Sequence, residues 1–409
     1  MKKFLLLLTL PFLMLGCNNE DLPQPILQAD ITVMAYLVAE NNLDDELKEN
    51  IRTMFLGLSS FDKSANLLIY WDGNSSIGGI DNPMILRYVC DGKGNINGKS
   101  TIGKDFTLKD ILDLADPVKQ YSSQVSTDKV VMSQVLNDMI NLCTTDKVGL
   151  VAGSHASSWV APYSRGRAFG DDNGNSIKLS DMAEAIGSTN RIFDFLLFDA
   201  CLMGSAEVCY DFKDVTNFQI VSALEIPADG FPYNLMIADL YEGTPNGYQK
   251  ACEKYISYYG DRADKNIINS WGTISLINSS KMESFSKVIK EELLSHKDEL
   301  KNFKVSGLQE YGRNWGKYVS VDIEHFIKTL NQGNIPTNFE NALNEVVVYT
   351  DCLDKTSDNA NSYIVDKNNY SGLGLYVPIK GKYEWNNHFK TIAWYNAVGW
   401  NEITFDWHF

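Results

Sequence analysis

The chain has 409 residues and a formal net charge of −16 at pH 7. A surface this acidic repels the phosphates of nucleic acids and of anionic lipids, so we exclude a nucleic-acid partner. An acidic enzyme can, however, attract cationic substrates. Hydrophobic residues make up 44% and aromatic residues 11% of the sequence, which is ample for a large core in one big domain or two.

The first residues have the pattern of an export signal. Lys2 and Lys3 precede an apolar stretch over 4–15, which is shorter than the roughly 20 apolar residues of a membrane-spanning helix. The sequence LMLGC at 13–17 resembles the lipobox of bacterial lipoproteins. We therefore expect an exported protein, lipid-anchored to a bacterial membrane on its periplasmic or cell-surface side through Cys17. An ordinary signal peptide with an incidental cysteine is the alternative.

Removal of the signal would take away two lysines and leave a mature chain with a charge of about −18. Residues 18–29 are polar and contain proline, which is typical of a tether between a bilayer and a folded part. The membrane is expected as a partner through the lipid anchor only.

Predicted strands and helices alternate over the first half of the chain. Apolar runs rich in β-branched residues predict strands at 29–38, 66–71, 85–89, 147–153, 193–198 and 220–224. Helical spacing of apolar residues occurs at 43–58, 107–115, 127–143 and 179–186. Because the connections are short, this pattern predicts an α/β sandwich with a largely parallel central sheet.

The second half continues the pattern without an obvious linker. Helices are expected at 248–259 and 281–299, and strands at 273–277, 318–322 and 372–378. We divide the folded part into a catalytic core over 30–235 and a C-terminal extension over 236–409 that packs on it. We expect a monomer.

The cysteines other than Cys17 show no metal-binding pattern, because no CxxC pair occurs and none has a histidine at ligand spacing. We expect no metal site, and we expect most of these residues to be buried thiols. They are Cys90, Cys143, Cys201, Cys209, Cys252 and Cys352.

Two residues of complementary chemistry end predicted strands. His155 follows the strand in VGLVAGSHASSW, and Cys201 follows the strand in FDFLLFDAC. Ligand sites in parallel sheets lie at the carboxyl ends of strands. An imidazole there can accept the proton of a thiol and later protonate a leaving amine. The alternative is a cysteine buried in the core and a histidine that caps a strand.

A helix is expected directly after Cys201, where the sequence continues with small residues. The N-terminus of that helix would lower the pKa of the thiol and offer backbone N–H donors to an oxyanion.

The order of histidine and cysteine, each at the end of a strand, resembles the caspase-like clan of cysteine peptidases. Within that clan the chain is most similar to the clostripain family, and the similarity spans nearly the whole mature chain. The matching blocks are YLVAENNL (36–43), SHASSW (154–159), FDACLMGSAEVCYDF (198–212), SALEIPADGFPYN (222–234) and SGLGLYVP (371–378). The resemblance implies a caspase-like α/β/α sandwich.

The resemblance further implies an endopeptidase that cleaves protein or peptide substrates after Arg or Lys through a thioester intermediate. Cys201 would be the nucleophile and His155 the acid and base. The acidic specificity residues of the family fall on Asp199 and Asp229, and carboxylates suit a guanidinium because Arg binds them bidentately. The alternative readings are that Asp199 caps the next helix and that Asp229 is a turn residue.

The backbone N–H groups of Ala156 and Cys201 are the expected oxyanion donors. The family usually has His-Gly where this chain has His155-Ala156. If a positive φ is required there, alanine is disfavoured by roughly 1 kcal/mol. This departure favours the rival hypothesis of a surface protein that binds peptides without hydrolysis. A third hypothesis is an amidase acting on non-peptide acyl groups.

The loop APYSRGRAFGDDNGN at 161–175 offers basic residues for self-cleavage, as in zymogens of the family. Arg167-Ala168 is the preferred bond and Arg165-Gly166 the second, with a plain polar loop as the alternative. The segment 171–175 resembles the opening of a calcium loop, but Ser176 and Met182 stand where Gly and Glu are needed. A solvated turn is therefore favoured, and no cofactor is expected to be required.

Overall fold

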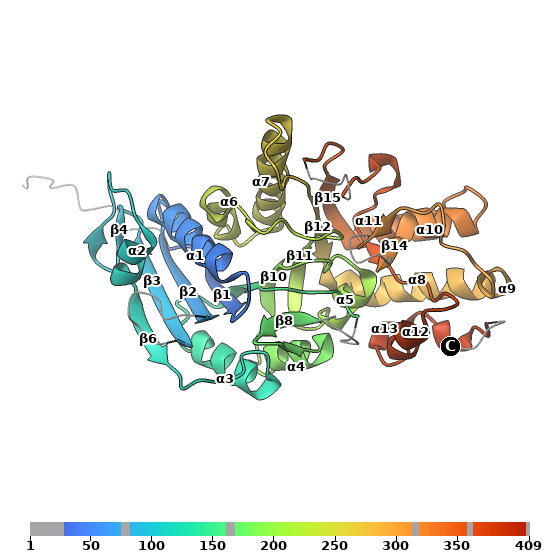
Figure 1. The fold of residues 1–409 in the computed structure, drawn as a ribbon, viewed down its shortest axis with the longest axis horizontal. Helices are drawn as coiled ribbons and strands as arrows, with labels where there is room; N and C mark the ends of the chain where they lie inside the picture. Colours follow the sequence, from blue (N-terminus) through green and yellow to red (C-terminus); the bar gives the residue numbers. More distant parts are fainter. Residues whose placement is uncertain (1–27, 75–81, 161–167, 313–318, 358–362, 406–409) are drawn as a thin grey trace, which may run out of the picture.

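The computed structural model describes residues 28–74, 82–160, 168–312, 319–357 and 363–405. An 11-stranded sheet runs through the molecule in the order β15-β12-β11-β10-β7-β1-β2-β3-β4-β5, and β6 pairs with β3. Figure 1 shows this sheet at the centre with helices on both sides. The predicted α/β/α sandwich is confirmed.

The middle of the sheet is parallel, which fits strands that read as continuous apolar runs. β1 pairs with β2 and β7, and β10 pairs with β7 and β11, all in parallel. The five strands are β1 (Ile31–Ala39), β2 (Ser64–Gly73), β7 (Lys147–Gly153), β10 (Phe193–Asp199) and β11 (Thr216–Val221).

Side chains of β1 alternate between two core layers, as the pleat of a strand requires. Val33, Ala35 and Leu37 pack on one face, and Met34 and Tyr36 pack on the other. The first face is covered by α1 (Asp44–Ser59), α6 (Tyr233–Leu240) and α7 (Pro245–Asp264). The second is covered by α3 (Lys129–Ile140), α4 (Leu179–Gly187) and α5 (Ala206–Asp211).

Strands from the C-terminal half complete the same sheet. β12 (Thr273–Asn278) joins β11, and β15 (Val347–Cys352) joins β12, both antiparallel. The boundary placed at residues 235 and 236 falls inside α6. The C-terminal part therefore shares the core sheet as well as packing on it.

A smaller sheet and a group of helices make up the rest of the C-terminal part (Figure 1). The sheet has the order β13-β14-β16. The elements are α8 (Met282–Ser295), α9 (Lys297–Leu300), β13 (Glu310–Tyr311), β14 (Ser320–Asp322), α10 (Ile323–Leu330), α11 (Thr337–Val346), β16 (Gly374–Leu375), α12 (Tyr383–Phe389) and α13 (Ala393–Ala397).

The remaining strands and helices complete the description. They are β3 (Met84–Asp91), β4 (Asn95–Ile96), β5 (Lys99–Ser100), α2 (Leu108–Leu114), β6 (Asp116–Gln120), β8 (Phe169–Asp172), β9 (Asn175–Ile177) and the 3₁₀ turns η1 (Ser279–Lys281), η3 (Lys367–Asn369) and η4 (Trp400–Glu402). In the part of the chain that the structure describes, no helix is both long and apolar enough to cross a membrane. The six cysteines there are free thiols, and four of them are buried as predicted.

Candidate active site

The register of two neighbouring strands brings His155 and Cys201 to the same sheet edge. Gly153 of β7 pairs with Asp199 of β10, and the N–H of Ser154 donates to the carbonyl of Asp199 at 3.3 Å. His155 and Cys201 each follow this pair by two residues. Both therefore lie beyond the carboxyl ends of adjacent parallel strands, where such sheets carry their ligand sites.

The imidazole of His155 contacts a side chain that the sequence analysis did not single out. Nε2 of His155 lies 2.9 Å from Oδ1 of Asn42. Because an amide oxygen can only accept, Nε2 carries a hydrogen in this arrangement and Nδ1 is the basic nitrogen of the neutral ring. The signal was present, because Asn42 lies in the YLVAENNL block directly after β1, which is the other neighbour of β7.

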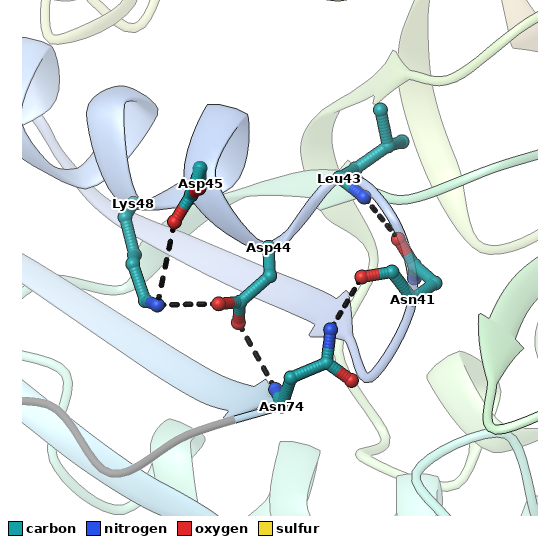
Figure 2. A network of polar contacts seen from close by, with 6 residues as sticks. All are labelled: Asn41, Leu43, Asp44, Asp45, Lys48 and Asn74. Atoms are coloured by element: carbon teal, nitrogen blue, oxygen red, sulfur yellow. Dashed lines mark hydrogen bonds and ion pairs between the residues drawn. The ribbon is translucent and has the colours of Figure 1, made fainter.

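The turn that carries Asn42 is held by a network of polar contacts (Figure 2). Oδ1 of Asn41 accepts from the N–H of Leu43 at 2.8 Å. Asn74, at the end of β2, donates from its side chain to the carbonyl of Asn41 at 2.5 Å and from its backbone to Asp44 at 3.0 Å. Asp44 also forms an ion pair with Lys48. The end of β2 and the first turn of α1 thus fix the backbone on both sides of Asn42.

Cys201 lies on a turn between β10 and α5. Leu202 has a φ of 63°, which is uncommon for a residue with a branched side chain. Its N–H donates to the carbonyl of Leu224 at 3.0 Å, and the N–H of Gly204 donates to the carbonyl of Ser222 at 2.7 Å. The turn is therefore bonded to the segment that leaves β11.

The predicted helix directly after Cys201 is wrong. α5 begins only at Ala206, with Ser205 as its N-cap. The backbone between them packs against the end of β11 instead of winding into a helix. At Gly204 an added Cβ would lie 2.6 Å from the backbone nitrogen of Ala223, so this close approach requires glycine.

The expected lowering of the Cys201 pKa is also wrong. Burial of the thiol raises its pKa to about 12, and the nearby charges of Glu225 and Asp199 act in the same direction. The thiol also lies 3.9 Å from the carbonyl of Ile226. At such a pKa the thiol is almost entirely protonated at pH 7. A base that accepts the proton would therefore be needed before this thiol could act as a nucleophile.

The alanine after the histidine does not strain the backbone. Ala156 forms an isolated bridge with Phe169, and the positive φ in this turn belongs to Ser158, at 61°. The bridge uses the carbonyl of His155, which accepts from Gly170 at 2.8 Å, and the N–H of Ser157. These bonds leave the N–H of Ala156 out of the bridge, so the feature that favoured a non-hydrolytic scaffold loses its physical basis.

Asp199 is a buried carboxylate at the end of β10, with 7% of its surface exposed. Its Oδ2 accepts from the Tyr233 hydroxyl at 2.8 Å, from Asn50 Nδ2 at 3.1 Å and from the N–H of Phe231 at 3.4 Å. Burial raises the pKa of Asp199 to about 6, although the bonds from Tyr233 and Phe231 lower it. Its partners lie on α1 and on the segment at 231–233, so it does not cap the next helix.

Asp229 lies in a different environment, on the surface. Its Oδ2 is 2.8 Å from Nη2 of Arg262, which lies on α7. Arg262 also donates from Nη1 to the Tyr258 hydroxyl at 3.2 Å. A substrate cation would compete with Arg262 for this carboxylate.

The acidic segment at 171–175 lies in the hairpin formed by β8 and β9. Among the described residues, no group of three or more His, Cys, Asp or Glu is arranged to hold a metal ion. Oδ1 of Asp171 accepts from Gly174 at 2.9 Å, and Asp172 accepts from the backbone of Ser126. Arg165, Arg167 and Cys17 lie outside the described residues.

Comparison with known proteins identifies the family and supports the fold. The model of the clostripain family matches residues 35–407. No curated protein matches the chain. A secreted C11 cysteine protease from Bacteroides thetaiotaomicron, in complex with an irreversible peptide inhibitor, is 23% identical with a TM-score of 0.73 over 91% of this chain and 100% of that one.

Two further solved structures are similar. An inactive zymogen C11 protease from Parabacteroides distasonis is 23% identical, with a TM-score of 0.70 over 91% of this chain and 98% of that one. A B. fragilis cysteine protease is 26% identical, with a TM-score of 0.52 over 57% of this chain and 98% of that one.

The fold and the paired strand ends define a caspase-like cysteine peptidase. The chain belongs to the clostripain family, and it is a hydrolase of peptide bonds that acts on proteins or peptides.

Proposed function

We propose that this chain is an exported, lipid-anchored endopeptidase that cleaves after Arg or Lys, with Cys201 as nucleophile and His155 as acid and base. The observation that carries the proposal is the pairing of Gly153 with Asp199, which sets both residues two positions beyond adjacent strand ends. The buried carboxylate of Asp199 beside them supports recognition of a cation.

The chemistry follows from the protonation states. Nδ1 of His155 takes the proton of the thiol as Sγ attacks the carbonyl carbon of the substrate. The backbone N–H groups of Ala156 and Cys201 stabilise the negative oxygen that forms. The imidazolium then protonates the leaving amine, which leaves a thioester on Cys201. Water, deprotonated by His155, hydrolyses the thioester and restores the thiol.

Asn42 holds the imidazole in this cycle. Its Oδ1 accepts from Nε2, which favours the tautomer with a basic Nδ1 and stabilises the imidazolium once it forms. Asp199 and Asp229 are proposed to bind the basic side chain of the substrate residue before the scissile bond. Asp199 would do so from the buried end of β10. Asp229 would first have to release Arg262 and then pair with the substrate cation.

Maturation and location complete the proposal. The Parabacteroides distasonis relative is described as an inactive zymogen, and we propose that this chain is activated by self-cleavage at Arg167-Ala168, or else at Arg165-Gly166. Ala168, the first described residue after that loop, leads directly into β8. Cys17 is proposed to carry the lipid. The thiol and imidazole suffice for the reaction, so no metal or cofactor is proposed, and the protein is proposed to act as a monomer.

Mass spectrometry of the purified wild type beside Cys201→Ala tests the proposal. The wild type should show a break after Arg167 or Arg165 and should cleave peptides with Arg or Lys before the reporter group. The variant should stay intact and inactive. An intact wild type would rule out self-processing, and equal cleavage by the variant would rule out Cys201 as the nucleophile.

A further inference from the structure

Glu225 is a buried carboxylate near the proposed nucleophile, and one of its oxygens has no hydrogen-bond partner in the part of the chain that the structure describes. Its side chain is 7% exposed. Among the described residues, its Oε1 has no hydrogen-bond partner. Burial raises the pKa of Glu225, and its charge in turn raises the pKa of the Cys201 thiol. Buried acidic oxygens without partners are rare in folded proteins because desolvation of the group is not compensated.

A second buried polar atom without a partner lies near the same place. Tyr255 is fully buried, and its hydroxyl has no hydrogen-bond partner within the described part of the chain. Its ring packs on that of Phe231 with the centroids 4.5 Å apart, and the N–H of Phe231 donates to Asp199. Burial raises the pKa of Tyr255, and the charges of Asp199 and Cys201 act in the same direction. Two buried polar atoms on separate elements near the end of β10, both without a partner among the described residues, indicate a place built to receive a polar ligand group.

The backbone around Glu225 is held firmly. The indole N–H of Trp271 donates to the carbonyl of Glu225 at 2.9 Å, and the carbonyl of the next residue, Ile226, faces the Cys201 sulfur at 3.9 Å. The side chain therefore starts from a fixed position beside the thiol.

We propose that Glu225 is a specificity-determining residue whose carboxylate, together with Asp199, binds the basic side chain of the substrate residue before the scissile bond. This inference rests on the proposed cleavage after Arg or Lys. The guanidinium or ammonium group of the substrate has several N–H donors and would supply a hydrogen-bond partner for Oε1 of Glu225. Asp229, in contrast, already has a cationic partner in Arg262.

The position of Glu225 has a consequence for the reaction. A negative charge beside a thiol opposes formation of the thiolate. A bound substrate cation neutralises that charge, so binding of the correct side chain removes an obstacle to deprotonation of Cys201. Substrates without the cation lose both contacts and this effect.

Glu225→Gln tests the proposal, because it removes the charge and keeps the shape. The purified protein is assayed on three peptides that differ only in Arg, Lys or the neutral isostere citrulline before the reporter. We expect kcat/KM to fall roughly 10- to 100-fold for Arg and Lys, as for loss of a charge-assisted contact. For citrulline it should change less than about threefold.

Alkylation of Cys201 by the neutral reagent iodoacetamide gives a second readout. Without the negative charge beside the thiol, the variant should react at least about twofold faster at pH 8, because a lower thiol pKa leaves more thiolate. A variant that is merely misfolded would not combine faster alkylation with a selective loss on cationic substrates.

Glu207→Gln is the matched control. Glu207 is also fully buried, and its Oε2 has no hydrogen-bond partner in the described structure. Its charge acts on the Cys209 thiol, and its Oε1 accepts from the Tyr376 N–H at 2.8 Å. The amide keeps that bond, so the Arg to citrulline ratio should match the wild type.

The outcomes are separable. Two outcomes would overturn the role of Glu225 and leave the proposed function standing. In the first, Glu225→Gln keeps the wild-type preference for Arg and Lys. In the second, the variant loses activity equally on all three peptides and is alkylated more slowly. A wild type that cleaves citrulline as well as Arg would overturn the proposed specificity and this inference with it.

Discussion

Cys201 and Cys209 lie eight residues apart, and burial raises the pKa of both thiols. A buried glutamate adds to the effect in each case, Glu225 for Cys201 and Glu207 for Cys209. Each glutamate has one oxygen without a hydrogen-bond partner among the described residues. Cys209 lies on α5, and its side chain is buried with 0% exposure. Cys201 is half-buried and lies on a turn at the same edge of the sheet as His155. If Cys201 is the nucleophile, as proposed, the comparison teaches that access and a neighbouring base, and not the resting pKa of the thiol, separate the two cysteines.

Replacement of each cysteine by alanine should break the comparison most sharply. Cys201→Ala should lower kcat by about 10³-fold or more, because the bond-forming atom is gone. Cys209→Ala should keep most of the activity and lose about 1 kcal/mol of stability through lost packing. Turnover of an Arg peptide and thermal unfolding measure the two effects. A comparable loss of activity from both variants would contradict the distinction.

Asp199→Asn should lower kcat/KM on Arg and Lys peptides by roughly 100-fold, because the amide cannot pair with the cation. Asn217→Ala is the control, because it changes an exposed side chain away from the site and adds no charge. Equal activity of Asp199→Asn and wild type would remove Asp199 from substrate recognition.

The pKa of Asp199, raised to about 6, also predicts a pH dependence. The cation needs the ionised carboxylate, so the affinity for the amidinium inhibitor benzamidine should be level above pH 7 and fall about tenfold per unit at pH values well below 6.

The same shift predicts how the stability of the fold depends on pH. Because the pKa of Asp199 in the folded protein lies above its ordinary value, protonation of Asp199 stabilises the fold. That contribution is present below about pH 4 and is lost as the pH rises through about 6. Inhibition constants and unfolding midpoints against pH would show both trends.

The carboxyl edge of the sheet could be predicted from sequence because each relevant strand is a continuous apolar run that ends at a polar residue. The environment of Cys201 could not be predicted from the sequence. The small residues after it are compatible with a helix start, but the bonds from Leu202 and Gly204 to the segment after β11 hold a turn instead. Such long-range bonds, like the contact of Asn42 with His155, depend on which segments meet in space.

Asn42→Ala should lower kcat by about tenfold with little change in KM, because the imidazole loses the acceptor that holds its orientation. The split between kcat and KM is the useful readout, since a substrate-binding residue would raise KM. Asn42→Asp keeps an acceptor and should recover part of the rate. A change confined to KM would place Asn42 in substrate binding instead.

Gly204→Ala should have the smallest effect on chemistry and a measurable one on stability. The new methyl group would meet the backbone of Ala223 at 2.6 Å, which should cost about 1–3 kcal/mol in unfolding free energy. Gly187→Ala, where the nearest atom is a side-chain carbon at 3.5 Å, should change stability by no more than about 0.5 kcal/mol. Denaturant unfolding of both variants would show whether the turn is as tightly packed as described.

The comparison between the two thiols is tested most directly by treatment of the wild type with an arginyl chloromethyl ketone, followed by peptide mapping. We predict a single adduct on Cys201, strongly reduced in His155→Ala. An adduct on Cys209 or Cys143, or none at all in a folded wild-type protein, would contradict the account.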